Sequence, residues 1–344
     1  MKAFLILEDG TVFTGTSIGS TKSVISEIVF NTSMTGYLEV LTDPSYAGQA
    51  VVMTYPLIGN YGITPDMESK QPWPDGYIVR ELSRIPSNFR CQGTIQDFLK
   101  EHDIPGIAGI DTRALTKILR EKGTMNGMIT TDENYKLDEI LPQLHVYNTG
   151  NVVDKVTCSE KEVLKADGYK VALLDFGAKN NIAQSLHKRG CEVTIYPAHT
   201  TAEEILASNP DGIMLSNGPG DPKACTDIIK EVKKLYDSEV PIFAICLGHQ
   251  LMALATGADT YKLKYGHRGG NHPVKDLETG RVYISSQNHG YAVDAESLDP
   301  AVAVPAFTNV NDGTNEGLKY TGKNIFTVQF HPEACPGPQD SGYL

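Results

Sequence analysis

The sequence predicts an α/β protein in which a doubly wound, mostly parallel sheet follows an N-terminal domain of mixed α+β type. From residue 169 onward, short apolar runs alternate regularly with segments of helical periodicity. Such alternation with short connections is typical of a parallel sheet covered by helices on both faces. Before residue 150 the candidate strands and helices alternate irregularly. We therefore expect an N-terminal domain at 1–150, a connection at 151–168 and a C-terminal domain at 169–344.

The N-terminal domain is expected to begin with a β-hairpin, because Asp9-Gly10 favours a tight turn between two short apolar runs. Asp43-Pro44-Ser45 is a further turn, in which Ser45 on local grounds is a turn hydroxyl. Asp111 or Thr112 is a suitable N-cap for a helix that stops at Gly123. The expected strands are 4–7, 12–15, 24–31, 50–55, 76–80, 107–110 and 126–131, and the expected helices are 94–102 and 114–122.

The C-terminal domain reads as strand, helix, strand, helix. In sheets of this kind, ligands bind beyond the carboxyl ends of the strands. Cys246, the loop 218–220 and His331 each follow a strand, so we expect them to meet at one edge of the sheet. The expected strands are 170–175, 192–196, 212–215, 242–245, 282–284 and 327–330, and the expected helices are 180–188, 202–208, 226–237 and 249–256.

Cys246 stands where one of these strands meets a helix. Residues 242–246 form a short apolar run, Leu247-Gly248 makes a sharp turn, and 249–256 has helical periodicity. A thiol at such a corner faces the amides of a helix N-terminus, which lower its pKa and favour the reactive thiolate. Taken alone, this stretch is equally compatible with a buried core cysteine.

His331 and Glu333 supply the partners that a nucleophilic cysteine needs. The strand expected at 327–330 ends at His331, and Glu333 follows two residues later across a stiff proline. A base must deprotonate the thiol, and a carboxylate must orient the base. Cys246, His331 and Glu333 are therefore the candidate catalytic residues.

Backbone amides near Cys246 are the candidate oxyanion donors. Attack of a thiolate on a carboxamide creates an oxyanion, which needs backbone N–H groups. Leu247 follows the nucleophile directly, and Gly218 or Gly220 offers a second amide because Pro219 has no N–H. Considered in isolation, the Gly-Pro-Gly loop is a turn without a function. Its place after a strand, one β–α unit before Cys246, favours the oxyanion role.

Gln250 and the segment 285–291 are candidates for substrate binding. Gln250 lies on the first turn of the helix after the nucleophile, where it faces either the substrate or the helix surface. The segment 285–291 reads as a polar turn after a strand. Asn288 and the backbone of Gly290 and Tyr291 can bind the amino and carboxyl groups of an amino acid.

The remaining histidines offer alternatives. His289 is a possible rival to His331 as the base, although no carboxylate follows it two residues later. His249 lies inside the expected helix, which favours a structural role. The stretch from His267 to His272 looks like a metal or phosphate loop, but it has no further set of ligands in the sequence. We expect no metal site in this chain.

Composition excludes several classes of function. The formal net charge is −12, which argues against a nucleic acid or an anionic membrane as partner. No apolar run approaches the ~18 residues of a membrane span, and the N-terminal apolar run is too short for a signal peptide. The six cysteines show neither CxxC pairs nor zinc-like spacing. Reduced thiols in a cytoplasmic protein are the simplest account.

The motifs CLGHQ and FHPE are similar to the two signatures of the class I glutamine amidotransferases, which share this order of Cys, His and Glu. Over nearly its full length, the chain resembles the small, glutamine-hydrolysing subunits of carbamoyl-phosphate synthase. Two residues depart from that family's usual pattern: Ala244 replaces a glycine, and Tyr291 replaces a frequent phenylalanine. The motifs that carry this resemblance are MTGYLEVLTDPSYAGQ, GIDTRALTKILREKG, LSNGPGDP, CLGHQ, GHRGGNHPV, SQNHGYAV and QFHPEACPGP.

The resemblance implies a flavodoxin-like amidotransferase domain that hydrolyses L-glutamine through a γ-glutamyl thioester on Cys246. His331 would act as base and acid, and Glu333 would orient it. Ammonia would pass to a large synthetase subunit, where ATP and Mg²⁺ are expected, and this chain would hold no cofactor. The positions that match the family's glutamine-binding residues are Ser45, Gly218, Gly220, Leu247, Gln250, Asn288, Gly290 and Tyr291.

Three other functions compete with this hypothesis. Another class I amidotransferase subunit is disfavoured by the first 150 residues. A non-catalytic docking subunit is disfavoured by the complete set of Cys246, His331 and Glu333. A stand-alone γ-glutamyl hydrolase or peptidase would show full glutaminase activity without a partner.

Overall fold

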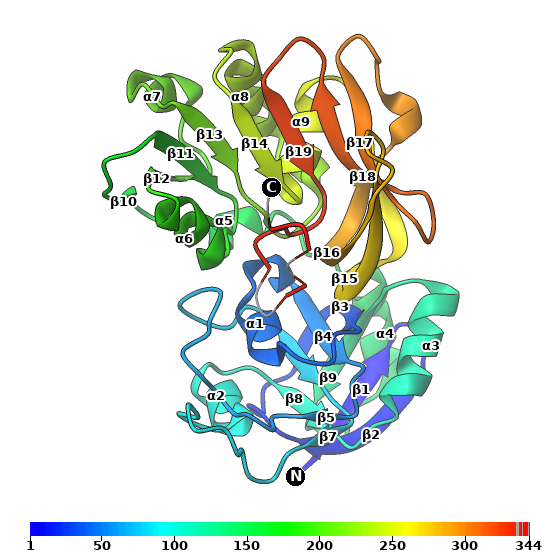
Figure 1. The fold of residues 1–344 in the computed structure, drawn as a ribbon. Helices are drawn as coiled ribbons and strands as arrows, with labels where there is room; N and C mark the ends of the chain where they lie inside the picture. The colour runs from blue at the N-terminus through cyan, green and yellow to red at the C-terminus, as the bar shows by residue number, and fades with distance from the viewer. Residues whose placement is uncertain (335–336, 339, 343) are drawn as a thin grey trace. The chain divides into compact units, whose positions relative to one another are not determined.

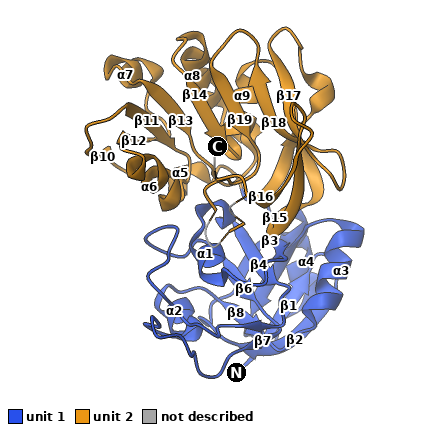
Figure 2. Ribbon diagram, in the orientation of Figure 1, with its two compact units in different colours: residues 1–149 blue, residues 150–344 orange. Residues whose placement is uncertain are grey.

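The computed structural model describes residues 1–334, 337–338, 340–342 and 344. The chain divides into two units, 1–149 and 150–344 (Figures 1 and 2). Cys335, one of the six cysteines, lies outside the described residues. The cysteines that are described are all free thiols.

Unit 1 is built on a closed barrel whose seven strands pair in the order β1-β2-β8-β6-β4-β3-β9. Parallel pairs join β3, β4, β6 and β8, and antiparallel pairs close the ring through β1, β2 and β9. The predicted mixed α+β character is therefore present, with barrel closure as the added feature. The barrel strands are β1 (Lys2–Leu7), β2 (Val12–Ser17), β3 (Val24–Asn31), β4 (Gln49–Met53), β6 (Gly76–Ile78), β8 (Gly106–Ala108) and β9 (Met125–Thr130), and β5 (Leu57–Ile58) pairs with β7 (Glu81–Leu82).

Helices pack on the outside of this barrel (Figure 1). The Asp111 side chain accepts a hydrogen bond from the Ala114 amide and Gly123 ends the same helix at φ 104°, so both predicted caps are confirmed. Two helices were not predicted: one at 37–42, and one at 137–146 with Pro142 inside it. The helical elements are α1 (Tyr37–Thr42), η1 (Pro44–Tyr46), α2 (Ile95–Glu101), α3 (Thr112–Lys122) and α4 (Leu137–Val146).

Unit 2 contains one ten-stranded sheet in the order β10-β12-β11-β13-β14-β19-β18-β17-β15-β16. The pairs from β12 to β19 are parallel, and the flanking pairs are antiparallel. The strands are β10 (Glu162–Leu164), β11 (Lys170–Asp175), β12 (Glu192–Pro197), β13 (Gly212–Leu215), β14 (Ile242–Ile245), β15 (Thr260–Asp276), β16 (Val282–Val293), β17 (Ala303–Asn309), β18 (Asn315–Tyr320) and β19 (Ile325–Val328).

Alternate residues of the central strands enter two different cores, as a doubly wound sheet requires. Ala172 and Leu174 of β11 join the core under α7, α8 and α9, whereas Leu173 joins the core that includes α6. The sheet is therefore covered on both faces (Figure 1). The helical elements of unit 2 are α5 (Val153–Val156), α6 (Asn180–Lys188), α7 (Ala202–Ala207), η2 (Pro222–Ala224), α8 (Thr226–Asp237), α9 (Leu247–Ala255) and η3 (Ala295–Ser297).

The segment 151–168, expected to be a connection, contains α5 and β10. Val153 is fully buried in the core of unit 2, and β10 pairs antiparallel with β12 at the edge of the sheet. Its weak periodicity is explained by this edge position, since two of the three β10 residues are exposed. The predicted polar turn at 285–291 is wrong, because these residues belong to the long strand β16.

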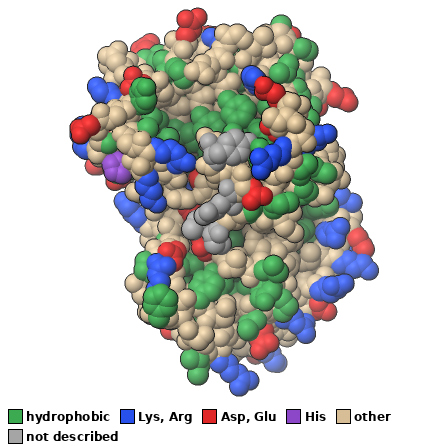
Figure 3. Space-filling view, in the orientation of Figure 1, with side chains coloured by type: hydrophobic (Ala, Val, Ile, Leu, Met, Phe, Trp, Pro, Cys, Tyr) green, Lys and Arg blue, Asp and Glu red, His purple; other side chains and the backbone are tan. Residues whose placement is uncertain are grey.

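The surface carries charged side chains of both signs, scattered over the face shown in Figure 3. Among the helices of the described residues, none is long and apolar enough to cross a membrane.

Candidate active site

Cys246 lies at the junction between β14 and α9, as the sequence predicted. Its backbone adopts φ 53° and ψ −104°, a region that non-glycine residues rarely occupy. Its N–H donates to the carbonyl of Val328 at 2.8 Å, and its Sγ lies 3.7 Å from the carbonyl oxygen of Asn288. Cys246 as a whole residue is 2% exposed. This sharp strand-to-helix turn is the geometry of a nucleophile elbow.

Gly248 allows the elbow to form because α9 presses directly against β13. Its N–H donates to the carbonyl of Ser216 at 3.0 Å. A Cβ at this position would lie 2.5 Å from the carbonyl oxygen of Leu215. Only glycine therefore lets the first turn of α9, and with it Cys246, sit this close to the sheet. Ala244, the family departure, is fully buried in β14.

His331 follows β19, the strand that pairs in parallel with β14 (Figure 1). Its N–H donates to the carbonyl of Ser286 at 2.9 Å, which ties it to β16. The His331 ring donates from Nδ1 to Oε1 of Glu333 at 2.8 Å. The predicted base and its orienting carboxylate are thus in contact, and Nε2 of His331 is buried with no hydrogen-bond partner among the described residues.

Glu333 has a second partner in Lys179, whose Nζ lies 2.7 Å from the same carboxylate oxygen. Both side chains are almost completely buried. Burial disfavours the charged carboxylate, but the charges of Lys179 and His331 outweigh it and hold the pKa of Glu333 well below its ordinary value. Glu333 therefore stays ionised at neutral pH and can orient the His331 ring.

Sequence reasoning missed Lys179 and Asn181. Both follow β11, and the Asn181 side chain donates to the backbone carbonyl of Glu333. The available signal was position: polar residues directly after a central parallel strand lie at the edge where sites form. The spacing from residue 179 to residue 333 offers no local pattern, so only the fold brings them together.

The Gly-Pro-Gly loop follows β13, and the two residues before it accept hydrogen bonds from the segment after β11. The Ser216 hydroxyl accepts from the Phe176 amide at 2.9 Å, and the Asn217 side chain accepts from the Lys179 amide at 3.1 Å. A Cβ on Gly218 would collide with the carbonyl oxygen of Phe176, and Gly220 has φ 89°. Both glycines are thus required by the backbone.

Leu247 is the first residue of α9, so its amide has no partner within the helix. This position and the braced glycine loop both lie at the carboxyl edge of the parallel strands, where the sequence placed the oxyanion donors.

Gln250 is buried rather than on the helix surface. Its Nε2 donates to the carbonyl of Tyr291 at 2.8 Å and to Oε1 of Gln329 at 2.9 Å. The helix that carries the nucleophile is therefore joined to β16 and to the residue after β19. Gln250 thus holds the backbone of a predicted substrate-binding residue.

Asn288, Gly290 and Tyr291 lie on β16, where Asn288 pairs with Arg268 of β15. The Asn288 carbonyl faces the thiol of Cys246. A Cβ on Gly290 would lie 3.2 Å from Nη2 of Arg268. The structure therefore brings Asn288 beside the nucleophile, whereas Gly290 and Tyr291 follow it on the same strand.

Ser45 belongs to unit 1, in η1, where its amide donates to Oδ1 of Asp43 at 2.9 Å. Ser45 is buried. The turn at 43–45 is confirmed as a short helical turn, and the glutamine-binding role of Ser45 stays a prediction.

Neither alternative histidine is free to act as the base. His289 is buried, with Nδ1 bonded to the carbonyl of Tyr291 at 2.7 Å and Nε2 2.9 Å from Oε1 of Gln287. Burial and the nearby charge of His267 hold the pKa of His289 well below its ordinary value. His249 is buried in α9 against Thr327, and burial lowers its pKa to about 3.

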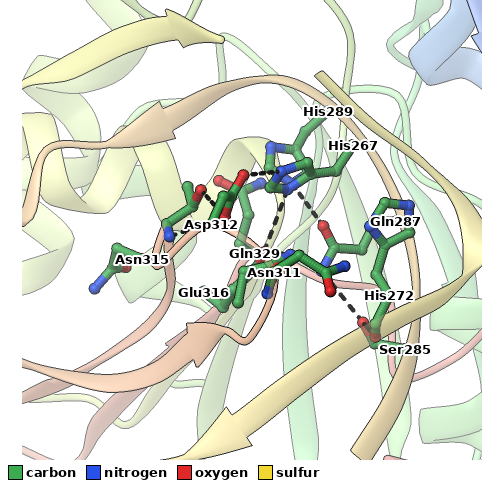
Figure 4. Close-up of polar contacts among 12 residues, drawn as sticks. His267, His272, Ser285, Gln287, His289, Asn311, Asp312, Asn315, Glu316 and Gln329 are labelled. Atoms are coloured by element: carbon green, nitrogen blue, oxygen red, sulfur yellow. Dashed lines mark hydrogen bonds and ion pairs between the residues drawn. The ribbon is translucent and has the colours of Figure 1, made fainter. Parts of the chain in front are cut away.

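His267 meets further ligand-type side chains that the sequence could not place beside it. His267, His289 and Glu316 offer ligand atoms that all lie within 4.8 Å of one another (Figure 4). His272 is not in this group. These three residues are the ones in the described part of the chain that could hold a metal ion.

The fold and the site define a class I glutamine amidotransferase. Residues 172–344 match the family model described as glutamine amidotransferase class-I. Residues 5–129 match the model described as carbamoyl-phosphate synthase small chain, CPSase domain. With the full-length relatives described next, these matches show that the chain belongs to the carbamoyl-phosphate synthase small chain family.

Several relatives that match this chain carry the name carbamoyl phosphate synthase small chain. The chain is 53% identical to that of Clostridium perfringens, with all of this chain and 97% of the relative covered. It is 52% identical to that of Listeria innocua, covering all of this chain and 94% of the relative. It is 50% identical to that of Clostridium acetobutylicum, covering all of this chain and 98% of the relative.

Proposed function

We propose that this chain hydrolyses L-glutamine as the small subunit of a carbamoyl-phosphate synthase and supplies the ammonia to a large subunit. The observation that carries the proposal is the strained Cys246 elbow directly after β14, together with the His331–Glu333 pair that follows β19, the strand that pairs in parallel with β14. The family to which the chain belongs supports the same reaction.

The reaction divides into two steps at Cys246. His331 accepts the thiol proton, and the thiolate attacks the carboxamide carbon of glutamine to form a tetrahedral intermediate. The C–N bond then breaks, and the proton on His331 passes to the departing nitrogen, which leaves as ammonia. A γ-glutamyl thioester remains on Cys246. Water, deprotonated by His331, hydrolyses the thioester to glutamate and restores the thiol.

Neighbouring groups stabilise the charges that develop. The amide of Leu247 and an amide of Gly218 or Gly220 donate to the oxyanion. Glu333 holds the His331 ring and stabilises its protonated form, and Lys179 keeps Glu333 ionised.

Glutamine binding is assigned to the β16 side of the site. Asn288 and the backbone of Gly290 and Tyr291 bind the amino and carboxyl groups, and Gln250 holds that backbone in place. The glutamine-binding role of Ser45, which the family resemblance implies, stays a prediction. The large subunit carries ATP and Mg²⁺ and combines ammonia with bicarbonate to make carbamoyl phosphate. We place the complex in the cytoplasm and its product in arginine or pyrimidine synthesis.

The decisive test is Cys246→Ser in the complex with a large subunit from the same source. Glutamine-dependent synthesis should disappear, because a serine hydroxyl is much less acidic than a thiol and His331 cannot convert it into an equally reactive nucleophile. Synthesis from added ammonia should continue. Loss of both activities together would make Cys246 a structural residue.

Two further measurements separate the alternatives. His331→Asn should slow formation of the thioester, and unchanged thioester kinetics would show that His331 is not the base. Wild-type glutamine hydrolysis should be weak alone and rise sharply with the large subunit, ATP and bicarbonate. Full activity without the partner would instead identify a free-standing hydrolase.

A further inference from the structure

We propose that His267 is a positioning residue for glutamine binding: paired with Glu316 and Asp312, it acts as a buried cation that fixes the substrate-binding part of β16. This inference rests on the proposed glutaminase function and concerns a cluster outside the catalytic residues. Figure 4 shows the cluster, with His267 and His289 facing one another above Glu316.

The cluster places one imidazole between two carboxylates. His267 donates from Nε2 to Oδ2 of Asp312 at 2.8 Å, and its Nδ1 lies 3.4 Å from Oε1 of Glu316. The side chains of His267 and Glu316 are 8% and 0% exposed, whereas that of Asp312 is 45% exposed. A carboxylate as deeply buried as Glu316 needs a cation beside it, and His267 is the group placed to supply one.

The local charges favour the protonated form of His267. Burial alone would lower the pKa of His267, but Asp312 and Glu316 outweigh it and raise the pKa to about 9. The other titratable groups that face it are His272 and His289, and the pKa values of both lie below the ordinary value because of burial and of the charge on His267. His267 therefore carries the additional proton of this histidine cluster and is cationic at neutral pH.

His267 also contacts the substrate-binding strand. It pairs across the sheet with His289, and the two rings meet edge to face with centroids 4.9 Å apart. Irregularities in pairing flank this place, between Lys262 and His267 and again between Gly269 and His272. The backbone ladder here is therefore short, and side-chain contacts must fix the strand.

These contacts close a ring around the site. In this closed series of contacts, His267 lies next to the Glu316 side chain, and the backbone carbonyl of Glu316 accepts from the Gln329 amide at 2.9 Å. Gln329 accepts from the Gln250 side chain, which also donates to the carbonyl of Tyr291. His289 donates to that same carbonyl and returns the ring to His267. The ring thus joins the nucleophile helix, the end of β19 and β16.

A proton fits the cluster better than a metal ion does. His267, His289 and Glu316 could in principle ligate a metal, but both ring nitrogens of His289 already contact Tyr291 and Gln287. A metal would have to break one of these contacts. The proton on His267 balances Glu316 and leaves the contacts intact.

The test compares variants in the complex with the large subunit, with glutamine hydrolysis as the readout. His267→Gln should raise KM for glutamine roughly tenfold or more, because a small displacement of the binding groups is sufficient for such losses. The kcat should stay within about threefold of wild type, and ammonia-dependent synthesis should be unchanged. In the double variant His267→Gln/Glu316→Gln, KM should return toward wild type, since no uncompensated buried charge remains.

Leu318→Ala is the matched control, because it creates a cavity in the same strand as Glu316 and does not touch the charges. It should lower the melting temperature with little change in KM. If His267→Gln does not fold, Asp312→Asn removes the outer carboxylate and should raise KM in the same direction by a smaller factor.

Three results would overturn the inference: an unchanged KM in His267→Gln, an equal rise of KM in Leu318→Ala, or a stoichiometric metal ion in the wild-type chain that His267→Gln loses. Failure of the proposed function is distinguishable, because it would appear as absent glutamine hydrolysis by the wild-type complex itself.

Discussion

Replacing Gly248 with alanine should damage the active site without changing any catalytic group. The added Cβ would lie 2.5 Å from the carbonyl oxygen of Leu215, whereas real Cβ contacts essentially never fall below 3.0 Å. The first turn of α9 must therefore move by about 0.5 Å or more away from β13. Cys246 and the Leu247 amide stand at the start of that turn, so they must move with it.

The magnitude follows from the tightness of the contact. Overpacking of this kind costs about 1–3 kcal/mol of stability. A displacement of roughly 0.5 Å also reaches the tolerance of a catalytic constellation. We expect glutamine hydrolysis to fall by about 10- to 100-fold, while ammonia-dependent synthesis by the complex stays at the wild-type rate.

The assay is steady-state glutamine hydrolysis in the complex, with thermal unfolding of the same preparations. Gly93→Ala is the control, because a Cβ there meets no atom within 4 Å. It should match wild type in both measurements. A wild-type hydrolysis rate in Gly248→Ala would refute the reasoning that close packing of α9 on β13 sets the position of the nucleophile.

Two further predictions concern the buried charges. Lys179→Met should destabilise the chain by about 3–5 kcal/mol, because Glu333 loses its cationic partner in the interior. The pKa of Glu333 should rise as well, so the acidic limb of the pH–rate profile should move to higher pH; an unmoved limb would contradict the pairing. Stability should also depend on pH in two directions, measured as the free energy of unfolding in urea. His272, with its pKa lowered to about 4, and His289, whose pKa is also lowered, should each remove about 1.4 kcal/mol per pH unit as the pH falls below about 6.5. His267, with its pKa raised to about 9, stabilises fully below about pH 6.5 and should lose that contribution, about 3 kcal/mol, as the pH rises to 9; a flat profile from pH 5 to 9 would exclude both effects.

The central part of unit 2 was predictable because local signals and fold agree there. The strands β11, β12, β13 and β14 occupy the predicted runs to within a residue. Apolar runs of four to six residues, separated by amphipathic helices, have few other arrangements. The corner at Cys246 followed from the same alternation, whereas the strand expected at 327–330 lies at Ile325–Val328 and ends before His331.

The antiparallel flank was not predictable in the same way. Strand β15 spans 260–276 and contains glycines, histidines and Pro273, residue types that are depleted in strands or interrupt their pattern. Its conformation depends on pairing with β16, including two irregularities of register. Such pairing is a tertiary property, and the polar alternation of 285–291 therefore looked like a turn.

The barrel closure of unit 1 has the same origin. Parallel neighbours such as β4 and β6, or β6 and β8, are separated by long stretches of chain, so no short-range pattern specifies their order. The candidate catalytic residues were found because each carries its own motif. Lys179 was missed because its role exists only through its contact with Glu333.

The strained backbone of Cys246 makes loss of the nucleophile favourable for stability. A non-glycine residue held at φ 53° carries a conformational penalty of about 1–3 kcal/mol. Glycine at this position would relieve that penalty, so the simplest stabilising substitution at the elbow is also one that removes the nucleophile. A copy of this chain released from selection for glutamine hydrolysis would therefore gain stability by losing its cysteine. Retention of Cys246 at such a position is a continuing sign of selection for chemistry rather than for folding.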